Sequence, residues 1–385
     1  MNKFMSAQGG SALGGKKILL ITRPIAPPWD EASKNFAYYL AKSLDMFEMY
    51  LLTNGTIPNL PPHIHQKSIY TSNHLSYLQK IRLLKLRKIL RTDFDILHYM
   101  LTPNKLNSFS FKTFIKSRKA KTIQTIATLR EDLFSDDDFK EILFADLIIT
   151  YSDYAKNKLN SLGFKNVKRV YPGIDLEIYS PKTKNQTVLK ELGLKEDEFI
   201  VTFPGEYIRL GATDDIVNMI IENAKTLREK KIKIIFACRL KNDRQAIEKN
   251  KEVVQKLQEN KAGDLVIFID IFPDMAKLYN LSDIIIFPVQ NMYGKFDIPL
   301  AVIEPMACEK PVILSDLPIL SELGNKNSSV IIEKGNTKQL AEAILDLYNN
   351  SEKRKALGIE ARKFVKQNFD LKNISAIYQK IYEIL

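Results

Sequence analysis

Residues 281–316 read LSDIIIFPVQNMYGKFDIPLAVIEPMACEKPVILSD, and this stretch decides the fold that the sequence predicts. Its apolar run 284–287 is typical of a buried parallel strand. A polar loop follows, and then a helix is expected over residues 298–309, with Pro299 in its first turn. A second apolar run at 312–314 predicts another strand. The order strand, loop, helix and strand indicates one unit of a parallel α/β sheet.

Such a loop is a natural site for anions, because free N–H groups and the helix dipole point outward where it enters the helix. Glu304 lies a little over one turn inside the expected helix. Its carboxylate can therefore accept hydrogen bonds from ribose hydroxyls while phosphates bind at the helix start. The same pattern also fits a plain β–α–β unit with a surface glutamate, and periodicity alone does not separate the two.

Beyond this local pattern, the stretch resembles the signature of retaining glycosyltransferase family 4. The matching positions are Pro299, Leu300, Glu304, Met306, Ala307, Cys308, Pro311, Val312, Ser315 and Asp316. Residues 170–175 (VYPGID), with Tyr179 and Pro181 after them, resemble the interdomain strand end and linker of that family. Residues 201–205 (VTFPG) resemble the first strand and glycine turn of its C-terminal domain. The similarity extends from Lys16 through most of the chain and is most specific over 281–316.

The resemblance implies an α/β chain with the GT-B fold, in which two Rossmann-like domains face a central cleft. It also implies a retaining transfer of a hexose from a nucleotide-diphosphate sugar to a lipid-linked or polysaccharide acceptor at a membrane surface. The nucleotide sugar is then a substrate, and neither a cofactor nor a metal ion is expected.

Short apolar runs alternate with helix-length segments along the chain, which predicts parallel sheets with right-handed crossovers. The first series of expected strands is 17–22, 49–53, 95–99, 122–126 and 146–150. The second series is 197–203, 231–237, 264–269, 283–287, 311–314 and 329–332.

A chain of 385 residues is too long for one core, so two domains are expected. The expected parts are a flexible tail (1–15), an N-terminal acceptor domain (16–172), a linker (173–197), a C-terminal nucleotide-sugar domain (198–360) and a final helix (361–385). By the resemblance, that final helix returns to the N-terminal domain.

Composition places the chain among ordinary globular proteins, with 45% hydrophobic and 26% charged residues. The sequence contains no run of 18 uncharged apolar residues, so no membrane-spanning helix is expected. Cys238 and Cys308 fall in separate expected elements and in no metal-ligand spacing, so neither a disulfide framework nor a zinc site is expected. Unpaired thiols fit a reducing environment, and a cytoplasmic location follows as an expectation.

The net charge of +12 is concentrated in the first half of the chain. Through residue 180 there are 26 Lys and Arg against 16 Asp and Glu, and the remainder has 31 against 29. Segment 79–91 interleaves cations with leucine and isoleucine, which predicts a basic amphipathic helix. Such a helix can lie on the anionic inner face of a membrane, or pack on its own domain with a solvated basic face. Nucleic acid is not expected as a partner, because no binding motif accompanies the charge.

Candidate site residues follow from these patterns and the resemblance. The residues expected at the donor are Gly205, Arg209, Arg239, Phe272, Ile298, Pro299, Leu300 and Glu304. Lys295 and Asp297 are the catalytic candidates, although Asp297 is equally suited to cap the following helix. Trp29, Asp30, Ser33 and His98 are expected on the acceptor side. For His98 a packed structural role, and for Trp29 a loop anchor, are the alternatives.

Several positions depart from the family pattern. Glu206 stands where the family usually has an arginine that binds the diphosphate, and Phe296 stands where the first glutamate of its pair normally falls. Ala127 to Arg130 follow a strand that often leads to a histidine. These departures leave a second function open, a catalytically degenerate GT-B protein that acts as a partner subunit or a sugar-binding or nucleotide-binding scaffold.

Overall fold

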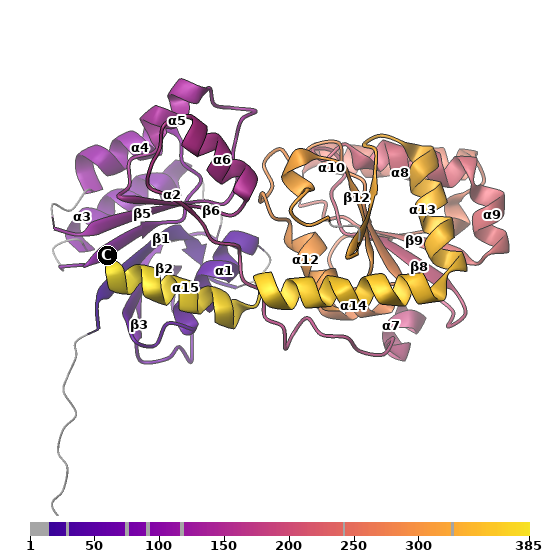
Figure 1. Cartoon of the computed structure of the whole chain (residues 1–385), viewed down its shortest axis with the longest axis horizontal. Helices are drawn as coiled ribbons and strands as arrows, with labels where there is room; N and C mark the ends of the chain where they lie inside the picture. The colour runs from indigo at the N-terminus through magenta and orange to yellow at the C-terminus, as the bar shows by residue number, and fades with distance from the viewer. Residues whose placement is uncertain are drawn as a thin grey trace, which may run out of the picture.

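The computed structural model describes residues 15–27, 31–73, 77–89, 93–115, 119–241, 243–324 and 327–385. Two separate parallel sheets, each covered by helices, form an N-terminal and a C-terminal domain (Figure 1). The strand order is β3-β2-β1-β4-β5-β6-β7 in the first sheet and β10-β9-β8-β11-β12-β13 in the second. The α/β class and the two parallel sheets predicted from the sequence are confirmed.

The first sheet consists of β1 (Lys17–Ile25), β2 (Glu48–Asn54), β3 (Ile64–Tyr70), β4 (Ile96–Tyr99), β5 (Lys121–Ile126), β6 (Leu147–Thr150) and β7 (Val167–Arg169). The second consists of β8 (Phe199–Phe203), β9 (Ile232–Ala237), β10 (Val266–Ile269), β11 (Ile284–Phe287), β12 (Val312–Ser315) and β13 (Ser329–Ile332). All the predicted strands are present. The strands β3 and β7 were not predicted, because both lie at a sheet edge and carry polar residues where a buried strand has apolar ones.

The helices of the N-terminal half are α1 (Ala32–Lys42), α2 (Tyr77–Arg82), α3 (Leu86–Ile89), α4 (Lys105–Ser110), α5 (Asp136–Ile142) and α6 (Asp153–Ser161). Those that follow are α7 (Gln186–Glu191), α8 (Ala212–Glu222), α9 (Ala224–Glu229), α10 (Arg244–Glu259), α11 (Met275–Leu281), α12 (Leu300–Ala307), α13 (Thr337–Asn349), α14 (Ser351–Asn368) and α15 (Leu371–Ile384). None of the helices in these described ranges has the length and apolar character needed to cross a membrane.

The basic segment 79–91 differs from its prediction. Instead of one amphipathic helix, α2 and α3 are separated by a 3-10 turn at Leu83–Lys85, and residues 90–91 lie outside the described ranges. Leu83 and Leu86 are buried in the core of the N-terminal domain, while Lys88 is exposed. The apolar side therefore packs on its own domain and leaves cations facing solvent.

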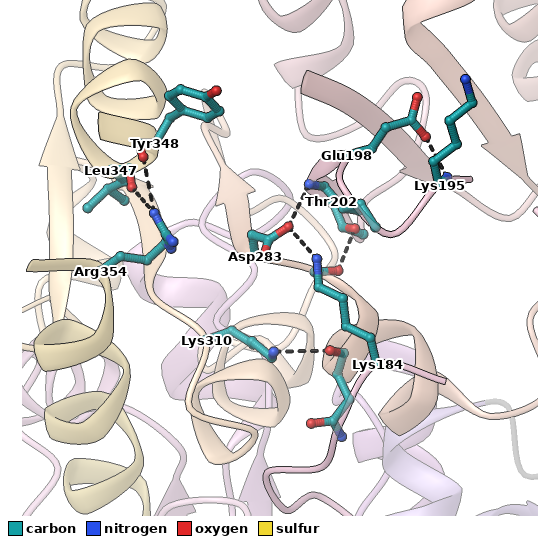
Figure 2. A network of polar contacts seen from close by, with 12 residues as sticks. Lys184, Lys195, Glu198, Thr202, Asp283, Lys310, Leu347, Tyr348 and Arg354 are labelled. Carbon is teal, nitrogen blue, oxygen red and sulfur yellow. Dashed lines mark hydrogen bonds and ion pairs between the residues drawn. The ribbon is translucent and has the colours of Figure 1, made fainter. Parts of the chain in front are cut away.

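The amino ends of the strands in the second sheet carry a network of structural polar contacts (Figure 2). Asp283 accepts hydrogen bonds from the backbone N–H of Ile200 at 2.8 Å and from Lys184 Nζ at 2.7 Å. Nearby, Glu198 accepts the backbone N–H of Lys195 at 2.8 Å. These contacts connect strand ends to neighbouring loops and stabilise the edge of the sheet opposite to the candidate site.

Two connections between the domains cross at one point. The backbone N–H of Ile174 donates to Phe369 at 2.9 Å, and that of Leu371 donates back to Ile174 at 3.0 Å. A Cβ on Gly173 would lie 2.9 Å from the Cα of Leu371, so only glycine allows this approach. Before the crossing, α14 runs along the C-terminal domain. After it, α15 packs on the N-terminal sheet (Figure 1).

The contact of α15 with the first sheet corrects the role expected for His98. His98 is completely buried, with Nδ1 2.7 Å from the hydroxyl of Tyr382 and Nε2 2.7 Å from the hydroxyl of Thr125. Burial lowers its pKa to about 3, so the ring is neutral. Because both ring nitrogens have partners inside the protein, His98 is not available to an acceptor and holds the C-terminal helix on the sheet.

Replacing Tyr382 by Phe should destabilise the N-terminal domain by about 1–3 kcal/mol, because one nitrogen of buried His98 loses its partner. The shift is measurable as a lower urea midpoint. Tyr293→Phe is the matched control, since the Tyr293 side chain is largely exposed. Equal midpoints for the two variants would contradict this role of Tyr382.

Candidate active site

The second sheet changes direction at its central strand. The chain winds from β8 to β9 and β10 on one side, and then to β11, β12 and β13 on the other. Connections that leave the carboxyl ends of neighbouring strands at such a switch point form a crevice where α/β proteins bind ligands. Three connections meet this condition, residues 204–211 after β8, 238–241 after β9 and 288–299 after β11.

The first connection turns sharply at Gly205. A Cβ at this position would lie 2.0 Å from the ring of Phe203, so the turn requires glycine. The next residue, Glu206, is 13% exposed at its side chain. Its Oε2 atom accepts from Lys295 Nζ at 2.7 Å and from Arg209 Nη2 at 2.7 Å. Because Glu206 follows β8 and Lys295 follows β11, this ion pair spans the switch point.

Arg239 and Lys241 follow β9 at the same edge of the sheet, and we call Arg209, Arg239, Lys241 and Lys295 the cation cluster. The pKa of Lys241 is lowered, first by partial desolvation and then by repulsion from Lys295, Arg239 and Arg209. A concentration of positive charge at a sheet's switch point favours a polyanionic ligand. The sequence singled out three of these cations but not Lys241, which follows β9 without a recognisable motif.

The helix start expected at Ile298–Leu300 lies beside the cluster. The helix α12 begins at Leu300, with Pro299 at its N-cap and no side chain satisfying the first N–H groups. Ile298 is fully buried and anchors the loop. Free N–H groups therefore remain at the helix start, as an anion site requires. Leu300 lies three residues after Asp297 and five residues after Lys295.

Glu304 lies one turn further along α12 and is held by two phenols. Tyr279 of α11 donates to its Oε2 atom at 3.1 Å. The residue keeps some exposure, but its carboxyl is surrounded by protein atoms, and this burial raises its pKa to about 7. The hydroxyls of Tyr179 and Tyr279 limit the rise. Figure 1 shows α12 on the side of the C-terminal domain that faces the N-terminal domain.

Asp297 is the residue whose expected role the structure corrects most clearly. It is 1% exposed and bonds across the domain boundary. Its Oδ1 atom accepts from the backbone N–H of Leu129 at 2.9 Å, and its Oδ2 atom accepts from the Ser152 hydroxyl at 3.0 Å. Its own N–H donates to Ala127 at 2.9 Å. Asp297 is therefore neither a helix cap nor an open catalytic carboxylate, and it joins the two domains.

A second carboxylate at the same boundary escaped the sequence analysis. Glu322 accepts from the backbone N–H of Tyr154 at 2.9 Å and from the hydroxyl of Tyr171 at 3.0 Å. Phe296 packs edge-on against Tyr151 at 5.4 Å between ring centroids. The position where the family carries its first glutamate thus contributes an apolar contact between the domains.

The remaining candidates lie apart from the cluster or outside the description. Phe272 follows β10 and packs with the apolar residues around α7 and α11. Ser33 is partly buried in the first turn of α1 and does not cap that helix. Trp29 and Asp30 lie outside the described residues. Within the described ranges, no group of three or more His, Cys, Asp and Glu side chains is arranged to hold a metal ion.

The C-terminal domain matches a known family. A model of the family described as "Glycosyl transferases group 1" matches residues 185–364. The match covers this domain, and the resemblance to glycosyltransferases is confirmed at that level. Membership of family 4 stays a prediction.

Among curated relatives, the spore coat protein SA of Bacillus subtilis is 28% identical over 264 residues, 61% of this chain and 64% of that protein. The N-acetyl-alpha-D-glucosaminyl L-malate synthase of Bacillus anthracis is 24% identical over 313 residues, 76% of this chain and 75% of that enzyme. The chain thus spans just under two thirds of the length of the first of these relatives.

A solved structure extends the comparison to both domains. The crystal structure of Anabaena Alr3699/HepE in complex with UDP and glucose has a TM-score of 0.76 and 16% sequence identity, and the match covers 96% of this chain and all of that one. At this identity the likeness establishes the fold. The GT-B arrangement of two Rossmann-like domains is therefore confirmed.

Replacing Asp297 by Ala should lower the free energy of unfolding by about 2 kcal/mol or more, because a buried N–H and a buried hydroxyl lose their acceptor. Urea denaturation measures this loss. The control is Asp137→Ala, whose side chain is 91% exposed in the first turn of α5. If the control is equally destabilised, the interdomain bonds of Asp297 are not the cause.

Proposed function

We propose that this protein is a retaining glycosyltransferase that moves a hexose from a nucleotide-diphosphate sugar to a lipid-linked or polysaccharide acceptor at the inner face of a membrane. The observation that carries the proposal is the cation cluster at the switch point of a group 1 glycosyltransferase domain. The relatives support it. One is the N-acetyl-alpha-D-glucosaminyl L-malate synthase of Bacillus anthracis, and one structural neighbour was solved in complex with UDP and glucose.

The main chemical demand of the reaction is the negative charge that builds on the leaving diphosphate. In the proposal, Lys295 and Arg209 contact the diphosphate oxygens, and the free N–H groups at the start of α12 add further donors. These fixed charges do the work that a metal ion does elsewhere, so the transfer needs none. Because Asp297 is committed to Leu129 and Ser152, it is not the attacking group, and the acceptor hydroxyl attacks from the face that the diphosphate leaves.

Glu304 is proposed to bind the ribose. A carboxylate that already accepts from the phenols of Tyr279 and Tyr179 is oriented by them and retains further lone pairs for two ribose hydroxyls. Its position one turn inside α12 sets the ribose next to the phosphates at the helix start. This division of roles follows the geometry of a nucleoside diphosphate, in which ribose and phosphates are neighbours.

The acceptor side is proposed to dock on an anionic membrane. Ile81 of α2 and Leu106 and Phe109 of α4 are apolar yet 45%, 58% and 60% exposed. The exposed Lys85 and Lys88 follow α2 directly in the chain, in the 3-10 turn and in α3. Exposed apolar groups among cations suit the boundary between headgroups and acyl chains.

Titration with UDP-, GDP- and ADP-glucose tests the donor site. We expect one of them to bind, and Glu304→Ala to weaken that binding at least about tenfold, or about 1.4 kcal/mol. An unchanged affinity would remove Glu304 from the donor site. Failure of all three sugars to bind wild-type protein would count against the proposed function as a whole.

The same titration should depend on pH. The pKa of Glu304 is raised to about 7, and only the ionised carboxylate accepts two hydroxyls, so binding should weaken as the pH falls from 8 to 6. A nucleotide sugar has no phosphate proton that titrates in this range. Glu304→Gln should bind more weakly and show a flat pH profile. A wild-type profile that is equally flat would contradict the ribose role.

Membrane docking is tested by sedimentation with vesicles that contain phosphatidylserine. The double variant Lys85→Glu/Lys88→Glu should lose most of its binding, since each cation near headgroups contributes about 1 kcal/mol. Lys225→Glu/Lys338→Glu is the control, because these lysines are 90% and 87% exposed on the C-terminal domain. Equal losses in both variants would show a general charge effect and no docking face.

The alternative of a degenerate scaffold rests on the departures Glu206 and Phe296, and it is not favoured by the relatives. Transfer of sugar, or hydrolysis of the donor, by the purified chain would exclude it. In the proposed mechanism this activity persists in the presence of EDTA.

A further inference from the structure

One negative charge lies inside the cation cluster. Among the described residues, Glu206 Oε2 accepts from both Lys295 and Arg209, and its Oε1 atom is buried without a hydrogen-bond partner. Burial raises the pKa of Glu206, but Lys295 and Arg209 outweigh it, so the pKa lies below its usual value and the group is ionised at neutral pH.

This carboxylate accepts from the same two cations that the proposed function assigns to the diphosphate. Lys295 and Arg209 are each 2.7 Å from Glu206 Oε2, a distance typical of charge-assisted hydrogen bonds to carboxylate or phosphate oxygens. Both cations remain partly exposed, with 28% of the Lys295 side chain and 53% of the Arg209 side chain accessible. A diphosphate that enters must therefore share or replace the contacts that Glu206 makes.

We propose that Glu206 is an internal counter-anion that sets the affinity of the cation cluster for the diphosphate group, and so limits how tightly the nucleoside diphosphate product is held. The proposal rests on the proposed function and concerns the same site. A fixed negative charge repels ligands in proportion to their charge. A nucleoside diphosphate carries about one more negative charge than the nucleotide sugar, since its terminal phosphate loses a second proton near pH ~6.

The charge pattern explains why such a residue is useful. Four cations without an internal anion repel one another and favour any polyanion, which slows release of the charged product. With Glu206 in place the cations are held together before the donor binds. Glu206 should therefore weaken the binding of the nucleoside diphosphate product more than it weakens the binding of the nucleotide sugar.

The experiment is isothermal titration with inorganic pyrophosphate, with UDP and with UDP-glucose. Glu206→Gln keeps the shape and the hydrogen-bond acceptor but removes the charge. We expect it to bind pyrophosphate about tenfold more tightly than wild type, and to gain less for UDP-glucose than for UDP. Glu206→Asp keeps the charge and should bind pyrophosphate as wild type does. Weaker or unchanged pyrophosphate binding by Glu206→Gln overturns the proposal.

Glu198→Gln is the matched control. Glu198 is 10% exposed, pairs with Lys233 at 3.7 Å and lies at the opposite end of the same strand, β8 (Figure 2). Its pyrophosphate affinity should equal that of wild type. If Glu198→Gln also tightens binding, the effect is one of total charge and the assignment to Glu206 fails.

A melting experiment covers the case in which Glu206→Gln is unstable. Added pyrophosphate should then bind where the carboxylate of Glu206 is missing. It should therefore restore the melting temperature toward that of wild type. No restoration overturns the proposal. If no nucleotide binds while the pyrophosphate pattern holds, the proposed donor is wrong and Glu206 keeps its role. If nucleotides bind and the pattern is absent, only the role of Glu206 is lost.

Discussion

Two hydrogen bonds to one buried carboxylate join the switch-point connection of the C-terminal domain to the N-terminal domain. Asp297 belongs to the connection after β11, yet its oxygens are bonded to Leu129 and Ser152 of the N-terminal domain. Burial raises its pKa to about 7 in spite of these donors. Because Lys295 lies two residues earlier and α12 starts three residues later, the same bonds fix the distance from the cation cluster to the N-terminal domain.

The cluster itself is a consequence of sheet topology combined with charge balance. A parallel sheet brings the connections after β8, β9 and β11 to one edge, so cations far apart in sequence become neighbours. Mutual repulsion among them opposes folding, and the pairing of Glu206 with Lys295 and Arg209 reduces that cost. The contacts of Glu206 with Lys295 and Arg209 therefore stabilise the fold, and they are the same contacts that we propose to set ligand affinity.

The sequence predicted the elements far better than the contacts between them. Apolar runs in the sequence predict the buried strands, whereas the edge strands β3 and β7 lack that pattern. Helix α12 and Glu304 were found from local spacing and from the resemblance. In contrast, the partners of Asp297 are 168 and 145 residues away, and those of His98 include Tyr382, 284 residues away. No local pattern encodes such pairs. Asp297 was therefore assigned to catalysis or to a helix cap although it joins the domains, and for His98 the alternative of a packed structural role is the one that agrees with the structure.

The position of α15 has a consequence for how the chain is made. The helix covers the first sheet and places Tyr378 and Tyr382 against His98 and Phe36, residues that leave the ribosome hundreds of codons earlier. The early sheet therefore emerges with an uncovered apolar face and a histidine that lacks its phenol. Its core closes only after translation has passed the whole C-terminal domain, so the first half of the nascent chain keeps apolar surface exposed during synthesis.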